Sequence, residues 1–494
     1  MMPSFVQSLW TALWQDAPLV QAPFFLIGIA SLMLWPGDLL IPRDQKRRWS
    51  LFTQIILGIT LYLVVVTPHR SGFSNMFRID TMTQAFQLIC TVATLATVVL
   101  SKKLLDLMNE HTVEFYTLLL FTLSGMLLLC GATDLVTLYF SIELMALPIY
   151  VLVGYFRDQE RGIEAGVKYF LLGAFSSGIM IYGISLLYGA TGGTTTNFEG
   201  LSTALVAAMD ARGTMVTLGV LMVLVGMAFK VAVVPFHMWT PDVYDGAPTP
   251  ITAFMASAPK AAAIFAFAKV FGVAFHNIPN VWTFGMEYMA AASMILGNVA
   301  ALRQQSMKRM LAYSSIAHVG YMMLAILSND PNLSIRSFSG VQSLWLYIFA
   351  YLFMNFGAFA IITFLQGKGE GERIDDFRGL SQRNPWLAFA MMLFLLSLAG
   401  IPPLIGFFSK FILFKMALER GFVVLTVIAV LTSAVSAYYY LGVINQMYFR
   451  SSTGKDSLKM DRMTGVLVSV CALMVLLGVS ASGWLIDIVD KIKL

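Results

Sequence analysis

Long, unbroken runs of apolar residues constrain this chain more than any other feature. A helix needs about 20 mostly apolar residues to cross a bilayer, and about fourteen such runs follow one another along the 494 residues. Apolar residues are consecutive in these runs rather than alternating, which favours helices over a β-barrel. A mean hydropathy of +0.76 with 12% charged residues lies outside the usage of soluble domains. We therefore expect an all-α polytopic membrane protein with about 14 transmembrane helices, whose runs begin near Leu19, Leu51, Ile79, Phe115, Asp134, Ala165, Met215, Ile251, Val281, Leu311, Val341, Trp386, Val423 and Gly465.

The basic residues between these runs predict how the chain is oriented. Most of them follow odd-numbered runs, as do Arg43, Lys46, Arg47, Arg48, Lys102, Lys103, Arg157, Arg161, Arg303, Lys308, Arg309, Lys368, Arg373, Arg378, Arg383, Arg450, Lys455, Lys459 and Arg462. By the positive-inside rule, the loops after odd runs face the cytoplasm and both termini lie on the periplasmic side. The first run follows the polar segment WQDAP and has no basic residue before it, so we expect no cleavable signal peptide.

Several lysines lie inside the apolar runs, where a charge is costly. A lysine at the bilayer centre costs about 2.5 to 3.5 kcal/mol on insertion scales, so each needs a path to the surface or a function. Lys269 and Lys415 lie near the ends of their runs, and we expect them to extend to the interface. Lys230, Lys260 and Lys410 lie deeper, and are candidates for a functional site.

One carboxylate matches these lysines in depth. Glu143, in YFSIELMALPIY, is about nine residues, or some 14 Å, into its run. A buried carboxylate can be a structural partner of a lysine. Alternatively, because burial disfavours the charged form of acids and amines alike, such a pair can exchange a proton near neutral pH.

Two histidines extend the set of candidates. His237 follows Lys230 by seven residues, nearly on the same helical face, although Pro235 lies between them. His318, in LAYSSIAHVGY, shares a face with Ser314. Each histidine is either a core hydrogen-bonding group or a member of a proton relay.

Prolines predict that two of the membrane helices are broken. Pro235, Pro241, Pro248 and Pro250 follow Lys230, and the adjacent prolines in SLAGIPPLIGFFSKF precede Lys410. Broken segments cannot face lipid, and transporters place ion sites at them. The two breaks are five runs apart, which predicts two inverted five-helix repeats with discontinuous helices 7 and 12. The corresponding boundaries are 1–110 for helices 1–3, 111–275 for the first repeat, 276–450 for the second repeat and 451–494 for helix 14.

Motifs for redox or nucleotide chemistry are absent from the sequence. Neither GATGGT nor GKGEGE forms a dinucleotide fingerprint, and no P-loop is present. Cys90, Cys130 and Cys471 lie singly inside apolar runs, which is typical of small core residues and indicates no metal site, disulfide or iron–sulfur ligation. The sequence therefore predicts an ion path, with no redox centre, cofactor or metal on this chain.

The segments FKVAVVPFHMWTPDVYDGAPTPITAFMASAPKAA, RMLAYSSIAHVGY and SLAGIPPLIGFFSKF resemble the antiporter-like membrane subunits of respiratory complex I, the proton-pumping NADH:quinone oxidoreductase. The resemblance runs from about Asp80 to about Tyr448, and TPDVYDGAPTP is typical of the N-type subunits rather than their L and M paralogues. It implies the same fourteen helices, inverted repeats and broken helices 7 and 12.

The resemblance also implies roles for individual residues. Glu143 matches the carboxylate of helix 5, and Lys230 matches its ion-pair partner on helix 7. The other implied members of the proton-transfer path are Lys260, Lys410, His237, His318 and a helix 6 lysine near the carboxylate, Lys168.

For partners, the resemblance implies the other membrane subunits, namely M and the small subunits J and K, and indirectly a peripheral redox arm. FMN, Fe–S clusters and quinone are expected in those partner subunits, and no nucleic acid is expected to bind. The bacterial inner membrane is the expected location, with a thylakoid membrane as the alternative.

Two other functions remain compatible with the sequence. The same helical architecture resembles the large subunits of multisubunit sodium/proton antiporters, from which TPDVYDGAPTP and the lysine at position 410 distinguish it only partly. A structural membrane scaffold of a redox complex is the second alternative. The buried Lys230, Lys260 and Glu143 argue against a scaffold, because apolar residues would serve it better.

Overall fold

The computed structural model describes residues 21–34, 47–108, 112–329, 340–452 and 460–478. The N-terminal part comprises α2 (Gln21–Leu34), α4 (Arg47–Val66), β1 (Arg70–Gly72), β2 (Phe77–Ile79), α5 (Thr81–Met108) and α6 (Thr112–Gly131). The middle part comprises α7 (Leu135–Val153), α8 (Glu160–Ala190), α9 (Phe198–Val231), α10 (Trp239–Gly246), α11 (Thr249–Lys269) and the π-helical turn η3 (Val270–Ala274). The last part comprises α12 (Pro279–Ala301), α13 (Met307–Leu327), α14 (Gly340–Gln366), η4 (Ile374–Phe377), α15 (Leu380–Arg383), α16 (Pro385–Ala399), α17 (Ile405–Glu419), α18 (Val423–Phe449) and α19 (Arg462–Leu477).

The chain is an all-helical polytopic membrane protein apart from one small hairpin. Within the described ranges, ten helices are long and apolar enough to cross a membrane. Every apolar run of the sequence overlaps a helix, and the run that begins near Trp386 is divided between α16 and α17. The antiparallel pair β1–β2 was not expected, because strands of three residues are too short to leave a periodic pattern.

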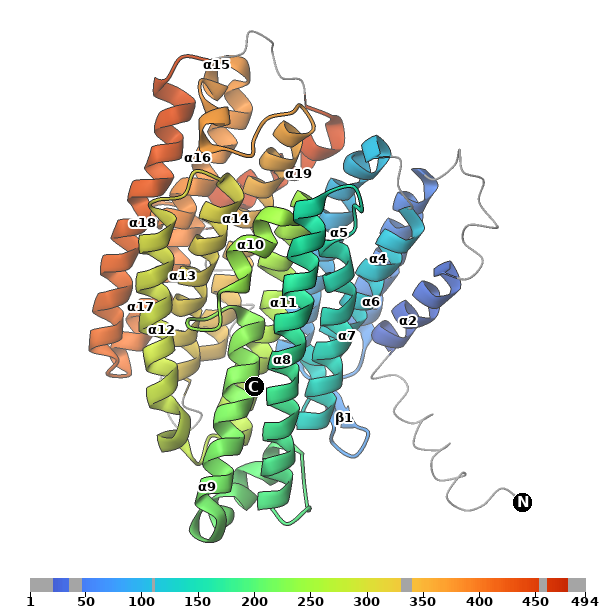
Figure 1. Ribbon diagram of the computed structural model, residues 1–494, viewed down its shortest axis with the longest axis vertical. Coiled ribbons are helices and arrows are strands. Elements are labelled where there is room, and N and C mark those ends of the chain that lie inside the picture. The colour runs from blue at the N-terminus through green and yellow to red at the C-terminus, as the bar shows by residue number, and fades with distance from the viewer. Residues whose placement is uncertain (1–20, 35–46, 109–111, 330–339, 453–459, 479–494) are drawn as a thin grey trace.

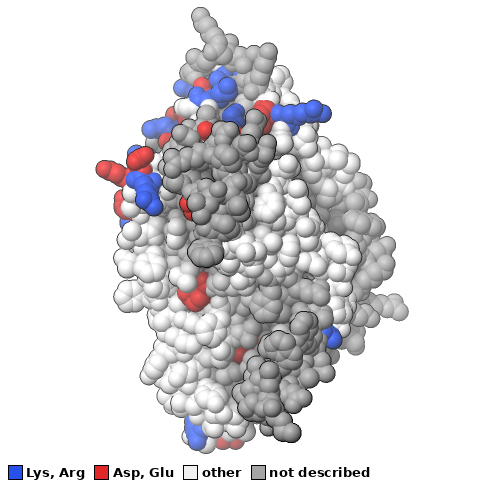
Figure 2. Space-filling model, turned by 90° about the vertical axis from the view of Figure 1, so that its right-hand side faces the viewer, with Lys and Arg blue, Asp and Glu red and all other residues white. Residues whose placement is uncertain are grey.

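The helices run side by side along the longest axis of the molecule (Figure 1). Helix α11 lies at the centre, and all of its residues are buried. α2 and α4 lie at one edge of the bundle, and α17 and α18 lie at the opposite edge. On the face drawn in Figure 2, charged side chains gather at the two ends, and a wide band between them is almost free of charge. That band matches a surface that faces hydrocarbon.

Side-chain caps fix where several helices begin. Asp134 accepts hydrogen bonds from the backbone amides of Val136 and Thr137 at the start of α7. Asn384 caps α16 through the amide of Leu387. These side chains satisfy backbone donors that the first turn of a helix leaves unpaired.

Both predicted helix breaks are present. α9 ends at Val231, where Ala232 takes a left-handed conformation with φ 64°, and the chain resumes as α10 only at Trp239. α16 ends at Ala399, where Gly400 takes a left-handed conformation with φ 85°, and α17 starts at Ile405. Lys230 and Lys410 therefore each lie beside an interruption, as the sequence predicts. α9 differs from the prediction at its other end, because it begins at Phe198 instead of near Met215 and contains a non-helical residue at Arg212.

Candidate functional site

Glu143 and Lys230 form the ion pair that the sequence predicts. Lys230 Nζ, from α9, lies 3.4 Å from Glu143 Oε1, from α7. The lysine side chain is 3% exposed and the glutamate side chain is 21% exposed. Ser177, on α8, donates a 2.5 Å hydrogen bond to the same carboxylate oxygen, and Lys230 Nζ also donates to the hydroxyl of Tyr150 at 3.2 Å. The charge of the buried ammonium is thus balanced by a carboxylate that is partly exposed at the surface of the protein.

His237 lies in the segment between α9 and α10, beyond the break. Its position relative to Lys230 is therefore not set by a helical repeat, and the expectation of a shared helical face is wrong. The ring is partly buried, and its Nδ1 has no hydrogen-bond partner in the described part of the chain.

Lys260 lies at the middle of α11 and is buried. Its Nζ donates a 2.8 Å hydrogen bond to Ser315 Oγ, from α13, and lies 5.4 Å from the ring centre of Tyr244, from α10. No carboxylate forms an ion pair with Lys260 among the described residues. A hydroxyl and the face of an aromatic ring are therefore the polar surroundings of this ammonium group.

A chain of aromatic residues, which we call the aromatic bridge, joins the surroundings of Lys230 to those of Lys260. Tyr150, which contacts Lys230, packs edge-to-face on Tyr169 at 4.7 Å between ring centres. Tyr169 stacks on Trp239 at 4.4 Å, and Trp239 lies 6.3 Å from Tyr244. The bridge consists of Tyr150, Tyr169, Trp239 and Tyr244.

His318 continues the series of polar groups on α13, one turn after Ser315. Its Nδ1 lies 2.7 Å from the hydroxyl of Tyr347, on α14, and its ring centre lies 5.7 Å from that of Tyr321. Lys410 Nζ in turn lies 5.2 Å from the centre of the Tyr321 ring. Buried tyrosines thus connect the central lysine region to the second broken helix.

Lys410 is held by the broken helix itself. Its Nζ donates to the carbonyl oxygens of Leu398 at 2.8 Å and Ala399 at 3.2 Å, at the end of α16, and to Ser433 Oγ at 2.9 Å, on α18. The last carbonyls of a helix have no partner within the helix and carry partial negative charge. The break therefore creates acceptors for a cation in the apolar bundle. An open, mostly apolar groove of about 570 Å³ adjoins Lys410 and includes Phe411, Phe414 and Ser433 in its lining.

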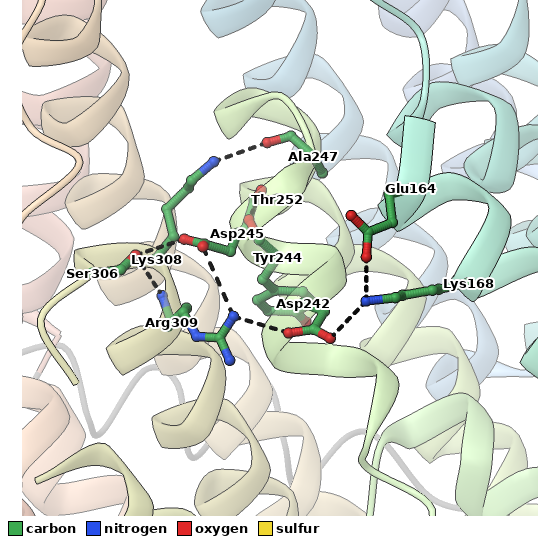
Figure 3. A network of polar contacts seen from close by, with 10 residues as sticks. All are labelled: Glu164, Lys168, Asp242, Tyr244, Asp245, Ala247, Thr252, Ser306, Lys308 and Arg309. Atoms are coloured by element: carbon green, nitrogen blue, oxygen red, sulfur yellow. Dashed lines mark hydrogen bonds and ion pairs between the residues drawn. The ribbon is translucent and has the colours of Figure 1, made fainter. Parts of the chain in front are cut away.

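Lys168, for which the resemblance implies a place near Glu143, forms its ion pairs with other carboxylates. It lies on the surface of α8 with its side chain 45% exposed, and forms ion pairs with Glu164 at 2.7 Å and Asp242 at 3.3 Å. Figure 3 shows these contacts beside α10. The pattern of apolar residues could not reveal this, because Asp242 reaches Lys168 only through the placement of α10.

Of the two lysines expected at the interface, one is buried. Lys269 is 7% exposed, and its Nζ donates to the carbonyl oxygen of Cys130 at 2.9 Å, so the prediction for this residue is wrong. The reason is that α11 is enclosed by neighbouring helices along its whole length. Lys415 is 60% exposed and pairs with Glu419 at 3.7 Å, in agreement with the prediction.

The cysteines and the buried tyrosines complete the survey of polar groups. Cys90, Cys130 and Cys471 are buried and unbridged, which confirms their interpretation as core residues. No group of His, Cys, Asp or Glu side chains suited to a metal ion occurs in the described ranges. Sequence reasoning missed Tyr150, Tyr244, Tyr321 and Ser315. Their signal in the sequence is weak, since a tyrosine or serine in a membrane helix is common.

Comparison with known proteins identifies the family of this chain. A profile of the family described as NADH:quinone oxidoreductase/Mrp antiporter, TM, matches residues 132–436. NADH-quinone oxidoreductase subunit N of Rhodospirillum rubrum is 40% identical over 463 residues, which cover 92% of each chain. The protein of the same name from Trichlorobacter lovleyi is 43% identical over 381 residues, which cover 77% of this chain and 76% of the relative.

Solved structures share the fold. A chain of respiratory complex I from Thermus thermophilus, with bound aureothin, has a TM-score of 0.79 and 31% identity, and the match covers 96% of this chain and 100% of that one. A chain of the Mrp complex from Dietzia sp. has a TM-score of 0.80 at 20% identity, covering 95% and 96%, which is a likeness of fold alone. The chain therefore belongs to the family of NADH-quinone oxidoreductase N subunits, which are membrane subunits of respiratory complex I.

Proposed function

We propose that this chain carries protons through the membrane arm of complex I along the buried groups from Glu143 to Lys410. The observation that supports this most directly is the order of contacts: Lys230 pairs with Glu143, Lys260 bonds Ser315, and Lys410 bonds the carbonyls of a broken helix. Buried ionisable groups in a membrane protein are costly, and proton pathways are a function that requires them.

The transfer begins at the ion pair. Quinone reduction elsewhere in the complex disturbs the contact between Glu143 and Lys230. When the carboxylate moves away, the buried ammonium loses its counter-charge and releases its proton more readily. Glu143 is suited to receive such a signal because it is the more exposed member of the pair.

The proton then moves to Lys260 and on to Lys410. Lys260 lacks a carboxylate partner among the described residues, so its protonation depends on whether Lys230 and Lys410 are protonated. Tyr244, Ser315 and His318 line the interval with hydroxyl and imidazole groups, and His237 lies in the adjacent break. Water between these groups would carry the proton over gaps longer than a hydrogen bond. Lys410 then releases the proton outward.

The proposed architecture has fourteen spanning segments and two inverted five-helix repeats with the boundaries 111–275 and 276–450. Support comes from the breaks after Lys230 and before Lys410, which lie at corresponding places in the two segments. Inverted repeats with broken helices at the membrane centre are typical of transporters. The periplasmic location of both termini is also a proposal, and residues 1–20 and 479–494 lie outside the described ranges.

The partners follow from membership of complex I, which assembles from several subunits. We propose contacts with the membrane subunit M and with the small subunits J and K, and an indirect link to the peripheral arm that holds FMN and Fe–S clusters and reduces quinone. The bacterial inner membrane is the proposed location. The 20% identity to the Mrp chain, against 40% to an N subunit, favours the complex I function over a sodium/proton antiporter.

The test compares wild type with Lys230→Ala in inverted membrane vesicles of the native host, and measures NADH oxidation together with proton uptake. We expect both to fall while reduction of an artificial acceptor by the peripheral arm is unchanged. Lys415→Ala, which removes an exposed lysine, is the matched control. Unchanged rates with lost tolerance to sodium or high pH would support the antiporter alternative. Pumping that resists substitution of Lys230, Lys260 and Glu143 would support the scaffold.

A further inference from the structure

Asp242 contacts two cations from distant parts of the chain. Arg309 Nη1, from α13, lies 2.9 Å from Asp242 Oδ1, and Lys168 Nζ, from α8, lies 3.3 Å from Asp242 Oδ2. Figure 3 shows the carboxylate between the two cationic groups. The helix that carries Asp242 is α10, which has only eight residues.

The end of α10 is tied to the start of α13 by further contacts. Ser306 Oγ donates to Asp245 Oδ1 at 2.6 Å, and Asp245 Oδ2 lies 3.9 Å from Arg309 Nη1. Lys308 Nζ donates to the carbonyl of Ala247 at 3.1 Å, just after α10 ends. These side chains converge on one end of the short helix (Figure 3).

α10 carries two members of the aromatic bridge. Trp239 stacks on Tyr169 and donates from Nε1 to the carbonyl of Phe229 at 3.1 Å, one residue before Lys230. Tyr244 lies under the ammonium of Lys260, and its backbone carbonyl accepts from Thr252 on α11. The position of α10 therefore determines where Trp239 and Tyr244 lie relative to Lys230 and Lys260.

On the side of α9, the backbone does little to fix that position. α10 is separated from α9 by the break after Val231, and from α11 by Ala247 and Pro248. We propose that Asp242 is a positioning residue, which with Arg309 and Lys168 holds α10 between Lys230 and Lys260. We call these three residues, Asp242, Arg309 and Lys168, the clamp. The inference rests on the proton path proposed above and assigns Lys168 to the clamp instead of to the path itself.

The clamp acts on geometry more than on stability. Asp242 is 42% exposed, Arg309 is 33% exposed and Lys168 is 45% exposed, and ion pairs with such exposure contribute little to folding. Proton transfer, in contrast, is sensitive to the placement of donor and acceptor. Loss of the clamp should therefore slow transfer in a complex that still assembles.

The experiment uses Asp242→Asn in the complete complex of the native host, with Asp158→Asn as the control. Asp158 is exposed in the loop between α7 and α8. We expect normal assembly and normal reduction of an artificial acceptor, with quinone-linked NADH oxidation and proton uptake lower by about three- to tenfold. Asp242→Glu should restore most of the rate, and hydrogen exchange of residues 239–246 should be faster in Asp242→Asn than in the control.

A double substitution tests whether the charges act as one unit. Arg309→Gln alone should lower the rate less than Asp242→Asn, because Lys168 keeps its contact with Asp242. The double variant should lose less than the product of the two single losses, because both substitutions remove the same Arg309–Asp242 contact. A double variant whose losses multiply would contradict the clamp. If the complex with Asp242→Asn does not assemble, Lys168→Gln is measured in its place. This variant keeps the Arg309–Asp242 contact, so we expect a smaller loss of NADH oxidation and proton uptake.

The outcomes separate this inference from the proposed function. Lys260→Met is measured in the same vesicles. If Lys260→Met loses pumping while Asp242→Asn keeps both its rate and its slow exchange at α10, the clamp is refuted and the path stands. If Lys260→Met pumps normally, the path itself is refuted, and the inference falls with it.

Discussion

Lys410 Nζ donates a 2.8 Å hydrogen bond to the backbone carbonyl of Leu398, so a lysine of α17 caps the end of α16 across the break that separates them. The two prolines after Ile401 interrupt the helix, and the interruption exposes the acceptors that the ammonium needs. The cation and the break therefore require one another. Without the break, a lysine at this depth would have no acceptor in the backbone.

Removal of this ammonium should stop proton release in the second half of the chain. We expect Lys410→Ala to lower coupled proton uptake by about tenfold or more, because a positioned proton-transfer group contributes at least that much. The measurement is proton uptake per NADH oxidised in inverted vesicles, with Lys415→Ala as the control on the same helix. Coupled pumping at the wild-type level in Lys410→Ala would exclude the proposed role.

The ion pair at the other end of the path gives a second prediction. Glu143→Gln keeps the shape of the side chain and removes the charge beside Lys230, so we expect quinone-linked proton uptake to fall about tenfold. Glu143→Asp, which keeps the charge, should retain more of the rate than Glu143→Gln. The two variants are compared at equal amounts of assembled complex, and equal rates in both would show that the charge is not what matters.

Packing at the second break gives a prediction on stability. A Cβ at Gly406 would collide with the backbone carbonyl of Ser397, so Gly406→Ala should force α17 away from α16. A collision with backbone cannot be relieved by a rotamer change, and we expect a loss of about 1 to 3 kcal/mol. The matched control is Gly442→Ala on α18, where a Cβ would meet nothing within 4 Å. Thermal unfolding of the purified complex measures both, and equal stability of the two variants would contradict the packing.

We predict that Lys269, although buried, is not part of the proton path. It is buried, but its Nζ donates to the carbonyl of Cys130, on α6, whereas Lys260 contacts Ser315 and Tyr244. We expect Lys269→Met to leave coupled pumping unchanged and to alter stability by no more than about 1 kcal/mol, because an apolar residue of similar size can replace a buried cation. Loss of pumping with normal assembly would mean that the path includes this lysine.

Much of the fold could be predicted from the sequence, because the membrane permits few solutions. The apolar runs had to form helices, since backbone groups in hydrocarbon must pair within the segment. Pro235 and Pro402 marked both interruptions, and Lys230, Lys260 and Lys410 stood out as charges that the bilayer penalises. Glu143 matched these lysines by its depth, and the family resemblance implied Lys230 as its partner.

The contacts around these charges were decided by the tertiary structure alone. α13 and α14 have no distinct apolar face and are almost wholly buried, so neither helix signals which neighbour it meets. The contacts of Lys260 with Ser315 and Tyr244 therefore could not be read from spacing, and neither could the burial of Lys269. The contact of Lys168 with Asp242 could not be predicted either, because it depends on the break after Lys230, which lets α10 turn toward α8. The sequence by itself determined which residues are too polar for lipid, and the packing of the helices decided which of them meet, since only packing brings distant segments within hydrogen-bonding distance.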